Sequence, residues 1–127
     1  SKWSEVVDSG RGQAYSFAVN KKLTFTAFNI YCYTGGHGNS KTASDSDDII
    51  HAAFLEMIEL PVGPTLITTD LNALPDDLPF VSELIATQGW TDVGASADLW
   101  GQTNEDFTCT GHNANNSTRR DFIFANN

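Results

Sequence analysis

The chain has 127 residues, 40% of them hydrophobic and 11% aromatic, which predicts a globular domain with a buried core and excludes a disordered segment. Its 16 acidic and 7 basic residues give a formal net charge of −9 at pH 7, which argues against extensive binding to duplex DNA because phosphate-binding surfaces are usually basic. No apolar run approaches the length of a membrane span and nothing resembles a signal peptide, so we expect an intracellular protein, nuclear or cytoplasmic.

The first third of the chain is predicted to form a β-hairpin. Two β-type runs, residues 14–19 and 23–32, are joined by Asn20-Lys21-Lys22, which is typical of a tight connection between antiparallel strands. Both faces of the second run carry apolar side chains, so we expect that strand to be covered on both sides. Residues 1–12 are mixed in character and end in a turn-prone stretch. Residues 34–41 contain three glycines and a lysine but lack P-loop spacing, so they are predicted to form a flexible connection.

A helix is predicted to begin at Ser44, because Ser44 and Asp47 fit a capping box. Its apolar stripe recurs at helical spacing and should pack on a sheet: Ile49, Ile50, Ala53, Phe54, Met57 and Ile58. His51 falls off this stripe, so we expect it to be exposed. Pro61 and Gly63 end the helix.

The second half of the chain continues with alternating strands and helices. A strand over 64–69 precedes a helix over 78–88, with Asp77 as its cap and Gly89 as its stop. A short strand over 90–93 leads into an irregular stretch, 94–104, whose Trp100 we expect to pack. Strands over 107–110 and 121–124 close the chain. This order predicts an α/β or α+β layered domain.

Two cysteines, Cys32 and Cys109, lie in apolar, strand-like contexts without metal-type spacing. Free, buried thiols in a reducing compartment are the prediction. One disulfide between them is the alternative.

Two polar residues, Asp70 and Asn72, stand at the carboxyl end of the strand over 64–69. Strand side chains at i and i+2 face the same side, so both should project from the strand end, where ligands bind in open α/β sheets. A carboxylate beside an amide suits a hydrated hard cation, or a water aimed at phosphorus. The alternative is that the two residues only start the turn that Pro75-Asp76-Asp77 continues.

Three motifs in order resemble the endonuclease/exonuclease/phosphatase superfamily, whose members include abasic-site endonucleases, non-LTR retrotransposon endonuclease domains, DNase I and sphingomyelinases. The first is Phe28-Asn29-Ile30-Tyr31, a strand ending in tyrosine before a glycine-rich loop. The second is Thr69-Asp70-Leu71-Asn72, where the family has Gly-Asp-hydrophobic-Asn. The third, residues 117–124, is similar to the family's Ser-Arg-hydrophobic-Asp-Tyr-hydrophobic segment. Together they extend the resemblance across nearly the whole chain.

The resemblance implies an α/β fold, the DNase I-like four-layer α/β sandwich, and metal-dependent attack of water on a phosphate ester. By analogy Asp70 orients and deprotonates the water, and Asn72 holds that water or the transition-state oxygens. Tyr31 hydrogen-bonds the phosphate, and Asp121 orients the family's catalytic histidine. The implied cofactor is Mg²⁺, with Mn²⁺ as a substitute, and its implied ligands in this chain are Asp70 and Asn72.

Two arginines at the start of the last strand, Arg119 and Arg120, are candidates for phosphate binding because arginine forms bidentate contacts with phosphate. The alternative is that the pair is merely solvated.

The chain also departs from the family. The family's upstream glutamate strand has no match, since Glu5 lies too close to the start, and no Ser-Asp-His segment follows Asp121. His37 and His112 lie in polar loops with different surroundings. We therefore interpret residues 1–127 as a partial domain, roughly the second half. The chain alone should have negligible nuclease activity, because catalytic groups that act as a unit fail together.

The leading hypothesis is a fragment of a Mg²⁺-dependent phosphoesterase, an endonuclease whose full-length form acts on nucleic acid. A small-substrate or phospholipid phosphatase or phosphodiesterase of the same superfamily is an alternative that the acidic charge favours. A degenerate, non-catalytic remnant that serves as a binding module is the other.

Overall fold

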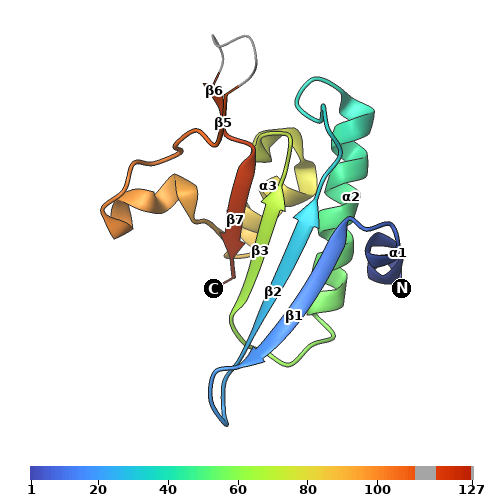
Figure 1. The fold of residues 1–127 in the computed structure, drawn as a ribbon, viewed down its shortest axis with the longest axis vertical. Helices are drawn as coiled ribbons and strands as arrows, with labels where there is room; N and C mark the ends of the chain where they lie inside the picture. Colours follow the sequence, from blue (N-terminus) through green and yellow to red (C-terminus); the bar gives the residue numbers. More distant parts are fainter. Residues whose placement is uncertain (111–116, 127) are drawn as a thin grey trace.

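The computed structural model describes residues 1–110 and 117–126 of the chain (Figure 1). The elements, in chain order, are α1 (Lys2–Asp8), β1 (Gly12–Ala18), β2 (Thr24–Tyr31), α2 (Ser40–Met57), β3 (Thr65–Asp70), η1 (Pro75–Asp77), α3 (Pro79–Thr87), β4 (Thr91–Asp92), η2 (Gly94–Trp100), β5 (Cys109–Thr110), β6 (Ser117–Thr118) and β7 (Asp121–Ala125). None of the described helices combines the length and the apolar character that crossing a membrane requires.

A five-stranded sheet in the order β1-β2-β3-β7-β4 forms the centre of the fold. β1 and β2 are the predicted antiparallel hairpin, and β3 runs parallel to β2 after the crossover through α2. β7 is antiparallel to both β3 and β4. The carboxyl ends of β2 and β3 and the start of β7 therefore meet at one edge of the sheet.

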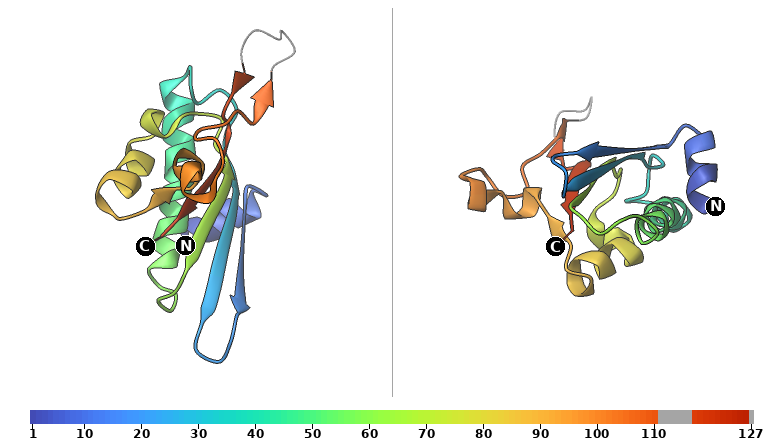
Figure 2. Two further views of the ribbon diagram at one scale, coloured as in Figure 1. Left: turned by 90° about the vertical axis from the view of Figure 1, so that its left-hand side faces the viewer. Right: turned by 90° about the horizontal axis from the view of Figure 1, so that it is seen from below.

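The helices lie on one face of this sheet (Figure 2). The core between them consists of fully or almost fully buried apolar side chains, among them Phe28, Ile50, Ile67, Val81, Leu84 and Phe124. Strands β2, β3 and β7 contribute alternate residues to the core, as strand geometry requires. The predicted α/β class is confirmed, with one sheet layer and one helix layer in the part of the chain that the structure describes.

The opposite face of the sheet is open. Tyr15 and Phe17 lie on it with 60% and 52% of their surface exposed, and their rings stack at 6.4 Å. The expectation that the strand over 23–32 is covered on both sides is therefore wrong for the described residues. An apolar face shows in the sequence, but periodicity does not reveal whether another element covers it.

Helix α1 was not predicted from the sequence. Trp3 anchors it, with 7% of its surface exposed and its ring edge-on to Phe28 at 5.1 Å. The first residue of β1 must be glycine, because a Cβ at Gly12 would lie 2.6 Å from the Trp3 ring. This short helix thus depends on a tertiary contact that its local sequence does not announce.

The predicted capping of the two long helices is wrong. α2 begins at Ser40, and Asn39 caps it by accepting a hydrogen bond from the Thr42 amide. Asp47 is instead buried within α2 and caps α3 from outside, accepting hydrogen bonds from the amides of Phe80 (2.8 Å) and Val81 (3.1 Å). A carboxylate at the start of α3 satisfies amides that have no partner within the helix.

The structure confirms some of the remaining sequence predictions and contradicts others. Gly89 adopts a positive φ of 74° after α3, as a helix stop requires. His51 is exposed as predicted, whereas Trp100 does not pack and is 58% exposed. Both cysteines are free, so no disulfide joins them, and burial raises the pKa of the Cys32 thiol to about 11.

Candidate functional site

Tyr31, Asp70 and Asp121 are direct neighbours across three strands. Tyr31 pairs with Asp70 in the β2–β3 register, and Asp70 pairs with Asp121 in the β3–β7 register. Paired residues point to the same face, and adjacent strands lie about 4.8 Å apart, so the three side chains form a row about 10 Å long. We call these three residues the rim cluster.

The rim cluster lines a cavity of about 680 Å³ on the open face of the sheet, which we call the first cavity. Asn29 and Thr68 lie one pleat below, and the Thr68 hydroxyl donates to Asn29 Oδ1 at 2.9 Å. Backbone hydrogen bonds extend the ladder beyond the strand ends, from Cys32 N to Asp70 O (3.0 Å) and from Leu71 N to Arg120 O (2.7 Å). The backbone under the cluster is therefore fixed by the sheet itself.

The ionised carboxylate of Asp70 lies in an unfavourable electrostatic environment. Its Oδ1 atom is buried and has no hydrogen-bond partner among the described residues. Burial, and secondly the negative charge of Asp121, raise the pKa of the Asp70 carboxyl above its usual value, although the N–H groups of Asn72 and the charge of Arg120 oppose this. A desolvated carboxylate facing a second carboxylate needs a proton or a cation.

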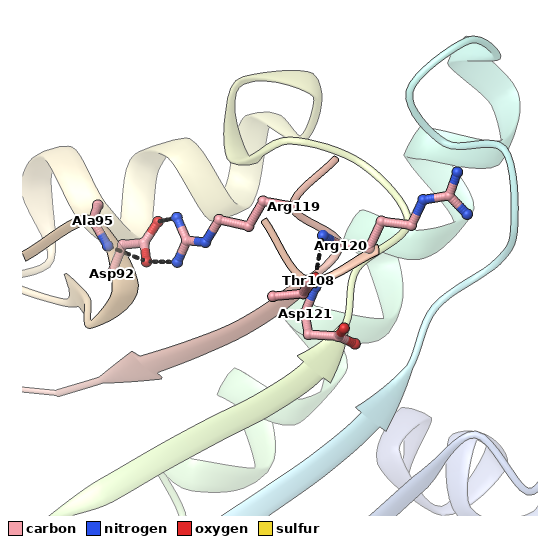
Figure 3. A network of polar contacts seen from close by, with 6 residues as sticks. All are labelled: Asp92, Ala95, Thr108, Arg119, Arg120 and Asp121. Carbon is pink, nitrogen blue, oxygen red and sulfur yellow. Dashed lines mark hydrogen bonds and ion pairs between the residues drawn. The ribbon is translucent and has the colours of Figure 1, made fainter. Parts of the chain in front are cut away.

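Thr108 fixes the start of β7 next to Asp121. Its hydroxyl oxygen accepts hydrogen bonds from the amides of Arg120 (2.9 Å) and Asp121 (3.1 Å). Figure 3 shows Thr108 directly beside the Asp121 backbone. The sequence reasoning did not select this threonine, because its contact spans 13 residues of chain.

Asn72 lies two residues beyond Asp70, past the end of β3. It adopts a positive φ of 52° and is only 9% exposed, a conformation that asparagine tolerates better than most residues. Its side-chain amide donates to Cys32 O at 3.4 Å. The position of Asn72 is therefore set by the turn after β3 and not by the alternation of side chains along the strand. Asn72 belongs both to this turn and to the candidate site.

The donors near the rim cluster can be tested against the implied metal. No group of three or more His, Cys, Asp or Glu side chains converges anywhere in residues 1–110 and 117–126. Mg²⁺ is commonly held by one or two carboxylates, with waters and phosphate oxygens completing the shell. Two adjacent carboxylates, one with an orphaned buried oxygen, and the nearby amide of Asn72 fit that requirement.

The two arginines point in opposite directions (Figure 3). The Arg119 guanidinium is buried, forms a bidentate ion pair with Asp92, and lies 4.2 Å from the Phe122 ring. Arg119 thus holds β4 against β7 and already has its anionic partner. Arg120 is exposed, and among the described residues its side chain bonds only Thr118, from Nε to Oγ1 at 3.2 Å. A phosphate contact from this pair therefore rests on Arg120.

Arg11 is a further residue at the site that the sequence reasoning did not select. Its Nη1 donates to the carbonyl oxygens of Tyr31 (3.2 Å) and Cys32 (3.3 Å). Its guanidinium lies 3.8 Å from the centre of the Tyr33 ring and 5.1 Å from that of Tyr31. Arg11 was not selected because it lies in a stretch whose composition predicts only a turn.

The two histidines that the structure describes, His37 and His51, do not line the first cavity. His37 is exposed, and its Nδ1 is 2.8 Å from Asp77 Oδ2, so Asp77 serves this pair rather than capping α3. His112 lies outside the described residues.

No family model matches the sequence, and no curated protein matches it. Solved structures do match. The human Nocturnin catalytic domain with bound sulfate anion is 13% identical, with a TM-score of 0.59, over 90% of this chain and 40% of that one. Truncated Caenorhabditis elegans TDP2 is 14% identical, with a TM-score of 0.61, over 91% and 46%. An endonuclease/exonuclease/phosphatase family protein from Bacteroides thetaiotaomicron is 17% identical, with a TM-score of 0.57, over 91% and 41%.

The chain shares the fold of these structures, which is the DNase I-like fold. It spans less than half of each of these three structures.

Proposed function

We propose that this chain is part of a divalent-cation-dependent phosphoesterase, and that the whole protein is an endonuclease that hydrolyses phosphodiester bonds of nucleic acid. The observation that carries the proposal is the rim cluster: three motifs spread over 90 residues of sequence place Tyr31, Asp70 and Asp121 side by side in one cavity. A structure of the same fold, D. rerio TDP2 complexed with single strand DNA product, has a TM-score of 0.57 at 13% identity.

Asp70 is the general base of the proposed reaction. It takes a proton from the attacking water. Asp121, its direct neighbour, keeps the negative potential high and orients a histidine in the complete domain.

Neutral donors face the phosphate. The phenol of Tyr31, which is 49% exposed, and the side-chain amide of Asn72 donate hydrogen bonds to phosphate oxygens as negative charge develops. Arg120 adds a cationic contact through its terminal nitrogens, which bond none of the described residues. When bound by Asp70 with Asn72, Mg²⁺ or Mn²⁺ supplies the charge that neutralises the phosphate.

A small-substrate phosphatase is the second candidate, because the net charge of −9 repels long polyanions. The Bacteroides thetaiotaomicron mannosyl-6-phosphatase Bt3783 has a TM-score of 0.51 at 18% identity.

The test is hydrolysis by the whole protein with Mg²⁺, comparing a single-stranded oligonucleotide, an abasic duplex and mannose 6-phosphate. Asp70→Asn should lower kcat by about 10²-fold or more, as the loss of a general base does. Glu59→Gln, an exposed carboxylate after α2, is the matched control. Unchanged kcat in Asp70→Asn would overturn the proposal, and a preference for mannose 6-phosphate would select the second candidate.

A further inference from the structure

A second cavity of about 730 Å³ lies beside the same end of the sheet. The loop after β2, the turn after β3 and the segments before β5 and β7 enclose it. Asn72 and Arg120 line it, so it adjoins the proposed site, and Phe122 lines both cavities. We call it the second cavity.

Two donors of the second cavity suit an anion. Asp77 Oδ2 accepts a hydrogen bond from His37 Nδ1 at 2.8 Å, which orients the ring. Nε2 has no partner among the described residues, and it donates to an anion when the ring is in its imidazolium form. Among the described side chains, Arg120 bonds only Thr118, through its Nε. An imidazolium and a guanidinium form charge-assisted hydrogen bonds with phosphate.

The rest of the cavity suits a base. Phe107 is 66% exposed and Leu74 is 44% exposed, and both line the cavity. An exposed aromatic ring is a platform on which a nucleic-acid base stacks. Glu105 also lines the cavity. Its carboxylate opposes a phosphate at that spot but accepts a hydrogen bond from an N–H group of a base.

The charge of the chain limits how much nucleic acid it can hold. With 16 acidic and 7 basic residues, the chain carries few cationic side chains with which to neutralise the phosphates of a duplex. A ring with one or two cationic side chains matches a single nucleotide with an unstacked base. Unstacked bases are a property of single strands.

We propose that the second cavity binds the nucleotide adjacent to the phosphate at the rim cluster, so that the substrate is single-stranded nucleic acid. This inference rests on the proposed function, since it assigns the substrate of the same site. Phe107 stacks on the base of this nucleotide, and His37 together with Arg120 binds its phosphate.

The test is fluorescence anisotropy of a short fluorescein-labelled oligothymidylate with the 127-residue chain, without divalent cation. Phe107→Ala should weaken binding about tenfold, the effect of losing one stacked base, and Phe107→Trp should restore it. His37→Ala should also weaken binding. The matched controls are Trp100→Ala, another exposed aromatic, and His51→Ala, another exposed histidine, and neither should change affinity.

Equal weakening by Phe107→Ala and Trp100→Ala would overturn the inference, as would binding that Phe107→Ala leaves unchanged. Competition by mannose 6-phosphate as effective as competition by unlabelled oligothymidylate would overturn it too, by indicating a site for small phosphates. The proposed function fails separately. If Asp70→Asn leaves hydrolysis intact while Phe107→Ala still weakens binding, the catalytic assignment is wrong and the nucleotide site stands.

Discussion

Replacing Asp70 by asparagine should stabilise the chain while removing its proposed catalytic function. The substitution keeps the shape of the side chain and removes the charge of a carboxylate whose Oδ1 is buried with no partner among the described residues. It also ends the repulsion from Asp121, which lies directly opposite on β7. Residues arranged for catalysis commonly cost stability in this way.

The magnitude follows from these two contributions. An unsatisfied buried polar group costs about 1–3 kcal/mol, and like charges directly opposite in a sheet cost about 0.2–1 kcal/mol. Because Asp70 is half-buried and the new amide also needs partners, we expect a net gain of about 1–2 kcal/mol. With an unfolding entropy of about 2.1 cal/mol/K per residue, this raises the Tm by about 4–8 °C.

The gain should depend on pH. The folded-state pKa of Asp70 is raised above its usual value of 3.8, so the folded protein binds this proton more tightly than the unfolded chain. Ionisation of Asp70 therefore lowers stability as the pH rises from 3.8 through the folded-state pKa, and the full penalty is present above it.

The assay is urea unfolding followed by circular dichroism, at neutral pH and at pH values approaching 3.8. The advantage of Asp70→Asn over the wild type should be largest at neutral pH and shrink toward acid, while Glu59→Gln should show neither effect. A destabilised Asp70→Asn variant, or a gain of equal size at every pH, would refute the assignment of Asp70 as a frustrated carboxylate.

Three further changes test the packing around the site. Arg119→Met should cost about 3–5 kcal/mol in urea unfolding because it strands the buried Asp92 carboxylate, and adding Asp92→Leu should recover most of the loss; equal stability of the single variant and the wild type would contradict this. Asp47→Ala should lower the free energy of unfolding by about 1–2 kcal/mol because α3 loses its cap, whereas Ser44→Ala should have little effect. A larger loss in Ser44→Ala than in Asp47→Ala would instead support a capping box formed by Ser44 and Asp47. Phe17→Ser on the open face should reduce self-association in sedimentation velocity, an effect that a monomeric wild-type chain would exclude.

The strands could be predicted from the sequence because they depend on local patterns, whereas the residues of the rim cluster were predicted from the motifs that resemble a known family. β-branched and aromatic runs bounded by turn residues marked β1, β2, β3 and β7. The polar residues of the motifs stood at the ends of those runs. Once β2 and β3 are parallel neighbours, Tyr31 and Asp70 must meet at one edge.

The features that could not be predicted depend on contacts between distant segments. Asp47 has the spacing of a local cap, but the amides of Phe80 and Val81, 33 and 34 residues away, bind it instead. Arg119 and Arg120 look equivalent in sequence. Adjacent residues near a strand point to opposite sides, and the partner that buries Arg119, Asp92, is 27 residues away.

The central claim is that the rim cluster binds a divalent cation, and Mn²⁺ titration of the ¹⁵N-labelled chain tests it most directly. Paramagnetic broadening at low Mn²⁺ should begin at the amides of Tyr31, Asp70, Asn72 and Asp121. It should saturate, and Asp70→Asn should abolish it while Glu59→Gln leaves it unchanged. Broadening that instead appears first along the acidic first half of α2, or that persists in Asp70→Asn, would contradict the account.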